Sequence, residues 1–80
     1  MVTVDNFNSN HIIDSETNKN KSETYQFFKE CCYDKGETPL VSRKFDEEFS
    51  VYHDEGNTID GDRVNATWLN IDFINKKENN

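Results

Sequence analysis

The spacing of apolar residues changes near residue 40, and this change limits the fold of the chain more than any other feature. Before it, Tyr25, Phe28 and Cys32 recur at the three- and four-residue spacing of a helix face. After it, mostly apolar residues occur at odd-numbered positions, as on a strand with one covered face. These residues are Val41, Phe45, Phe49, Val51 and His53. A helix followed by strands predicts an α+β fold.

The helix is predicted over residues 22–35. Ser22 is a suitable N-cap, and Glu23 complements the positive end of the helix. Gly36 suits the position just after the helix, and Pro39 prevents its continuation.

Two strands are predicted after the helix. The first covers residues 40–54, and the Asp60-Gly61 pair indicates a turn after it. The second runs from about 63–74 and is apolar on both faces, which favours a central strand or a bulge near 68–69.

The predicted architecture is one helix packed on a small antiparallel sheet of two or three strands, within a domain of residues 22–75. Residues 1–21 form a polar segment, either a loop or an edge strand through Val2 and Val4, and residues 76–80 a frayed tail. Only 32% of the chain is apolar, against about 45–50% in a usual domain. A homodimer is one way to complete so small a core.

Negative charge is concentrated in one stretch. Residues 45–62 contain seven acids and no Lys or Arg, while the remaining residues hold nine acids and nine bases. The formal net charge of −7 therefore comes from this stretch alone. Such a stretch serves either solubility or docking on a basic partner.

The leading functional hypothesis is a small acidic inhibitor that binds the basic surface of a nucleic-acid-handling protein. Carboxylates at alternate strand positions, such as Asp46 and Glu48, match every second phosphate step of one DNA strand. Direct nucleic-acid binding is disfavoured, because the acidic stretch repels phosphates. The predicted contact residues are Asp46, Glu47, Glu48, Tyr52, Asp54, Glu55, Asp60 and Asp62.

Two alternatives stay open. One is an immunity or antitoxin protein that neutralises a basic toxin, and the other is a structural or regulatory homo-oligomer. Eleven asparagines agree with an AT-rich genome such as that of a phage, a low-GC bacterium or a mobile element, and an inhibitor encoded by a phage would serve counter-defence. Overall the chain is similar in character to small acidic phage inhibitors, without a shared motif.

No catalytic, metal or cofactor site is predicted. The loop around Gly56 fits a calcium loop poorly, although an acidic turn can hold Ca²⁺ weakly. Cys31, Cys32, His11 and His53 lack the spacing of zinc ligands, and a Cys and a His in one chain are no catalytic pair by themselves. The chain is therefore not expected to be an enzyme.

The expected location is the cytoplasm, of the host if a phage encodes the chain. Residues 1–6 do not resemble a signal peptide, and no apolar run approaches a membrane span. Cys31 and Cys32 are adjacent, and neighbours rarely form a disulfide, so a reducing compartment is expected.

Overall fold

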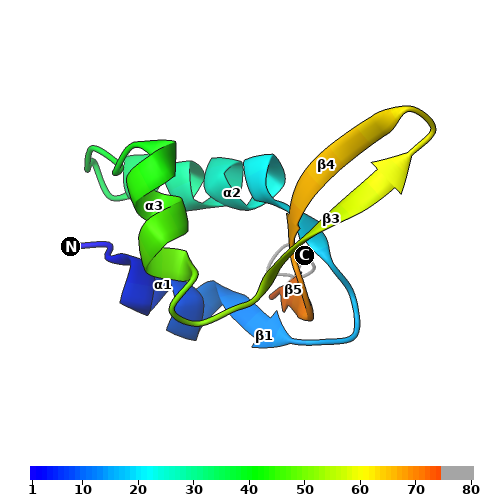
Figure 1. Ribbon diagram of the computed structural model, residues 1–80. Helices are drawn as coiled ribbons and strands as arrows, with labels where there is room; N and C mark the ends of the chain where they lie inside the picture. The colour runs from blue at the N-terminus through cyan, green and yellow to red at the C-terminus, as the bar shows by residue number, and fades with distance from the viewer. Residues whose placement is uncertain (75–80) are drawn as a thin grey trace, which may run out of the picture.

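The computed structural model describes residues 1–74, in which three helices precede a β-hairpin and a short final strand (Figure 1). The predicted α+β class is confirmed, with helices in two places where none was expected. The tail predicted for 76–80, like residue 75, lies outside the described residues. The elements are α1 (Val4–His11), β1 (Ile12–Asp14), β2 (Lys19–Asn20), α2 (Lys21–Asp34), α3 (Ser42–Phe49), β3 (Glu55–Asp60), β4 (Arg63–Trp68) and β5 (Ile71–Phe73).

Helix α1 occupies the segment where a loop or an edge strand was predicted. The Thr3 hydroxyl accepts a hydrogen bond from the backbone N–H of Asn6 (3.0 Å), and the Asn6 side chain accepts one from the backbone N–H of Thr3 (3.3 Å). This reciprocal cap starts a helix, and Val4 and Phe7 are then buried one turn apart. The strand predicted through Val2 and Val4 is therefore wrong.

Helix α2 confirms the predicted helix with a shift of one residue at each end. It begins after Asn20, not Ser22, and ends at Asp34. Gly36 follows with a φ of 70°, the left-handed conformation that glycine adopts without strain. The buried residues Thr24, Phe28 and Cys32 follow one another at four-residue spacing along one face.

Helix α3 replaces the strand predicted over residues 40–54, which is wrong. The backbone N–H of Phe45 donates to the carbonyl of Val41 (3.0 Å) and closes the first helical turn. Phe45 and Phe49 are both buried, and their four-residue separation fits a helix face as well as a strand face. Val51, which shares their parity, lies beyond the helix and is 78% exposed.

Strands β3 and β4 form an antiparallel hairpin that projects away from the helices in Figure 1. Its turn lies at the predicted place: Asp60 pairs with Arg63, and Gly61 between them has a φ of 63°. The predicted central position is confirmed, because β4 lies between β2 and β3, but the single strand predicted over about 63–74 is wrong, because β4 ends at Trp68. Asn70 has a φ of 60°, and the chain then leaves the hairpin sheet, ordered β2-β4-β3, for the second sheet, where β5 pairs with β1.

The core lies among the three helices and the inner end of the hairpin. The ring of Phe7 is within 6.2 Å, centroid to centroid, of four other phenylalanine rings. Each buried side chain of this size contributes about 1.5–3 kcal/mol. The buried apolar residues are Val4, Phe7, Ile12, Phe28, Cys32, Phe45, Phe49, Trp68 and Ile71.

Candidate functional site

The eight predicted contact residues do not share one strand face. They are distributed over a helix, a connection and a hairpin, and each element sets a different environment. Asp46, Glu47 and Glu48 lie on α3, Tyr52 and Asp54 in the connection after it, Glu55 and Asp60 on β3, and Asp62 in the hairpin turn.

Helix α3 separates the carboxylates that were expected to lie side by side. Phe45 and Phe49 face the core, and successive residues rotate by about 100° around the axis. Asp46 and Glu48 are thus ~200° apart, on opposite flanks, and Glu47 between them faces outward. The carboxylate spacing proposed to match DNA phosphates therefore does not exist on this element.

Asp46 lies in a partly buried charge cluster. Its Oδ1 is buried and has no hydrogen-bond partner among the described residues. Lys21 forms an ion pair with Glu55, and its Nζ also lies 4.6 Å from the centroid of the Trp68 ring. Burial raises the pKa of Asp46, Glu55 raises it further, and Lys21 opposes both. Asp46 and Glu55 thus lie beside Lys21 near α2 instead of forming an open acidic face.

The connection after α3 is bound to α1. The Tyr52 hydroxyl donates to Asp5 Oδ1 (3.2 Å), and Nε2 of His53 lies 2.6 Å from Asn8 Oδ1. Burial lowers the pKa of His53. Tyr52 keeps 42% of its surface exposed, and Asp54 is exposed beside it.

The hairpin tip, residues 59–64, combines apolar and acidic side chains in solvent. Ile59 and Val64 are opposite each other in the strand register and are 76% and 65% exposed. Asp60 and Asp62 flank the turn glycine, and Arg63 is the only base of the tip. Large apolar side chains exposed beside carboxylates are typical of interaction surfaces.

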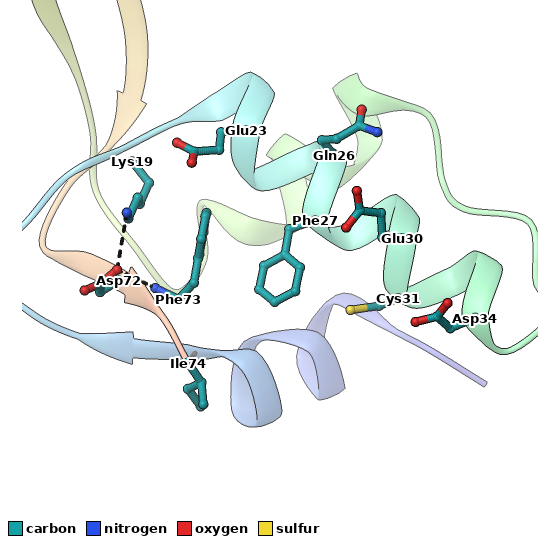
Figure 2. A pocket seen from close by; sticks show the side chains of 10 residues that line it. All are labelled: Lys19, Glu23, Gln26, Phe27, Glu30, Cys31, Asp34, Asp72, Phe73 and Ile74. Atoms are coloured by element: carbon teal, nitrogen blue, oxygen red, sulfur yellow. Dashed lines mark hydrogen bonds and ion pairs between the residues drawn. The ribbon is translucent and has the colours of Figure 1, made fainter. Parts of the chain in front are cut away.

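A groove of about 750 Å³, here called the α2 groove, lies between α2 and β5 (Figure 2). The rings of Phe27 and Phe73 meet in it at 5.0 Å. Lys19 forms an ion pair with Asp72 (3.3 Å), and its Nζ lies 5.0 Å from the centroid of the Phe73 ring. The lining residues are Lys19, Glu23, Gln26, Phe27, Glu30, Cys31, Asp34, Asp72, Phe73 and Ile74.

The α2 groove was not predicted, although part of its signal is visible in the sequence. Glu23, Phe27, Glu30 and Asp34 lie at helical spacing and therefore on one side of α2. The opposite wall comes from β5, nearly forty residues after the end of α2, and the pairing of β5 with β1 brings it there.

The cysteines and histidines have separate surroundings. Cys32 is buried in the core, and burial raises the pKa of its thiol. Cys31 and His11 both line a second groove of about 410 Å³ beside the N-terminal segment. Within residues 1–74, no three His, Cys, Asp or Glu side chains are grouped to hold a metal ion. In the same range, no helix has the length and apolarity to cross a membrane.

No protein-family model, no curated protein and no solved structure matches this chain.

Proposed function

We propose that this chain is a non-catalytic binding domain that docks on a basic surface of a nucleic-acid-handling protein and inhibits it. The observation that carries the proposal is the hairpin tip, where exposed Ile59 and Val64 share one face of the ribbon and Asp60 and Asp62 flank the turn glycine at its end. A partner that buries this tip supplies an apolar contact surrounded by Lys and Arg side chains.

The overall charge supports the same partner. A net charge of −7 on 80 residues attracts a basic protein at a distance and speeds the encounter. Proteins that bind nucleic acid present such basic surfaces, so an acidic domain seated there excludes the phosphates. The same logic applies to a phage counter-defence inhibitor and to an immunity protein against a basic toxin, with host or bacterial cytoplasm as the expected location.

Charge reversal at the hairpin tip tests this proposal. We expect Asp62→Lys to weaken capture of the partner from a cell extract at least about tenfold, because one carboxylate is lost and one repulsive cation is gained. Glu16→Lys is the matched control, since it changes the charge equally in an exposed loop. The captured protein should be basic, and duplex DNA should compete with the chain for it. Equal capture by wild type and both variants would refute the role of the tip.

A specific observation favours a second candidate, direct binding of duplex DNA. Helices α2 and α3 are joined by residues 35–41, a longer connection than the three or four residues of a helix-turn-helix, and a projecting hairpin follows them. In that motif the first residues of the second helix contact base edges. Arg43 and Lys44 are exposed there on α3. The net charge of −7 opposes phosphate binding and places this candidate second.

Duplex titration separates the two candidates. A DNA-binding domain shows affinity that falls steeply with salt and is lost in Arg43→Glu/Lys44→Glu. An inhibitor of a basic protein shows no duplex affinity at low salt, and the same α3 variant leaves capture of its partner intact.

A further inference from the structure

We propose that the α2 groove binds an amphipathic basic helix of a partner protein. An apolar side chain of that helix rests on the Phe27 and Phe73 rings, and its Lys or Arg side chains face Glu23, Glu30 and Asp34. This inference is independent of the hairpin tip, which shares no residue with the groove.

The charge of the groove selects a cation. Lys19, a basic residue that lines the groove, forms an ion pair with Asp72 (3.3 Å), so these two charges cancel. Glu23, Glu30 and Asp34 are exposed and form no ion pair within residues 1–74. Three carboxylates thus border an aromatic floor, and a cationic partner gains attraction from all three.

The spacing of the carboxylates along α2 fits a helical partner. Each residue of α2 advances ~1.5 Å along the axis, so Glu23 and Glu30 are about 10 Å apart and Asp34 lies about 6 Å further on. A helix with cations two turns apart and an apolar residue between them matches this arrangement, as in helix-in-groove recognition.

The experiment uses a synthetic amphipathic helix with Lys residues two turns apart and Leu residues between them, and a scrambled peptide of equal composition. Binding is measured by fluorescence anisotropy, and the site is mapped by amide chemical shifts. The groove variant is Glu23→Gln/Glu30→Gln/Asp34→Asn, which keeps polar side chains of similar size. The control variant is Asp60→Asn/Asp62→Asn at the hairpin tip. Circular dichroism confirms that both variants are folded.

We expect the wild type to prefer the amphipathic peptide over the scrambled one, and the groove variant to lose at least about tenfold in affinity. The hairpin variant should stay within about twofold of wild type, and peptide-induced shifts should centre on residues 23–34 and 71–74. Equal loss in both variants, or shifts centred on the hairpin, would overturn the groove inference and leave the hairpin proposal standing.

A further arm tests the chain itself as the occupant. Lys76 and Lys77 follow the last described residue closely in the sequence. If Lys76→Ala/Lys77→Ala moves the amide signals of residues 23–34 without peptide and tightens peptide binding, the groove belongs to the chain's own end. If the variant leaves both unchanged, the proposal for a partner helix is supported.

Discussion

At the residue scale, two of the predicted contact residues, Asp46 and Glu55, lie in a charge cluster around Lys21. Lys21 forms an ion pair with Glu55, and its Nζ lies over the Trp68 ring. Asp46 is close enough to Lys21 and Glu55 for both charges to act on its pKa. The buried Oδ1 of Asp46 has no donor among the described residues, so its negative charge loses hydration without full compensation. Asp46 is thus a cost to stability at neutral pH.

Replacing Asp46 by Asn should stabilise the chain at pH 7, by no more than about 1 kcal/mol because the carboxyl keeps partial access to water. Burial raises the pKa of Asp46, so the folded protein binds its proton more tightly than the unfolded chain. The advantage of the variant should therefore shrink as pH falls through the folded pKa, where the wild-type carboxyl becomes neutral. Urea unfolding at pH 7 and pH 3.5 measures this difference.

The control is Glu47→Gln, one residue further along α3, where the exposed carboxylate lies 3.9 Å from Lys44. We expect a change within about 0.5 kcal/mol at both pH values. A larger loss at pH 7 for Asp46→Asn than for Glu47→Gln would mean that the ion attraction to Lys21 outweighs burial.

At the element scale, residues 42–54 show why a period of two was mistaken for a strand. Phe45 and Phe49 are four residues apart, which satisfies both a helix and a strand. Val41 and Val51 are also at odd-numbered positions, which favoured the prediction of a strand, yet both are exposed outside the helix. The deciding fact is tertiary: Phe45 and Phe49 stack at 5.1 Å and fill the space between Phe7 and Trp68.

Truncations at residues 49 and 51 distinguish the two structures. On the predicted strand both side chains would face the core, whereas in the fold only Phe49 does. Phe49→Ala should cost about 3–5 kcal/mol, which is enough to unfold a domain of this size, and Val51→Ala less than about 0.5 kcal/mol. Thermal unfolding followed by circular dichroism measures both. Comparable losses at the two positions would support the strand.

At the scale of the whole molecule, one chain closes its own core. The shortage of apolar residues suggested a core completed by a second copy. Within residues 1–74, nine apolar residues are buried in the single chain, and five of them are Phe or Trp. Large rings bury more area for each residue than aliphatic side chains, which compensates for the low apolar fraction.

We therefore expect a monomer whose stability rises with salt. A net charge of −7 on a domain of this size repels itself, and ions screen that repulsion. Between low salt and 0.5 M NaCl, Tm should rise by about 2–4 °C, corresponding to about 0.5 kcal/mol. Calorimetry measures the shift and sedimentation equilibrium the mass. A Tm that rises with protein concentration would favour the homo-oligomer instead.

The sequence by itself determined the features that depend on residues close together in the chain. The α2 helix, its glycine end and the hairpin turn follow from local backbone preferences, and the excess of acids follows from composition. Tertiary structure alone decided the secondary structure of residues 42–54 and the arrangement of the acidic residues in space. Packing around Phe7 selected a helix over a strand of equal apolar pattern, and that helix turned Asp46 and Glu48 to opposite sides. The α2 groove was decided in the same way, because its walls meet only when β5 pairs with β1.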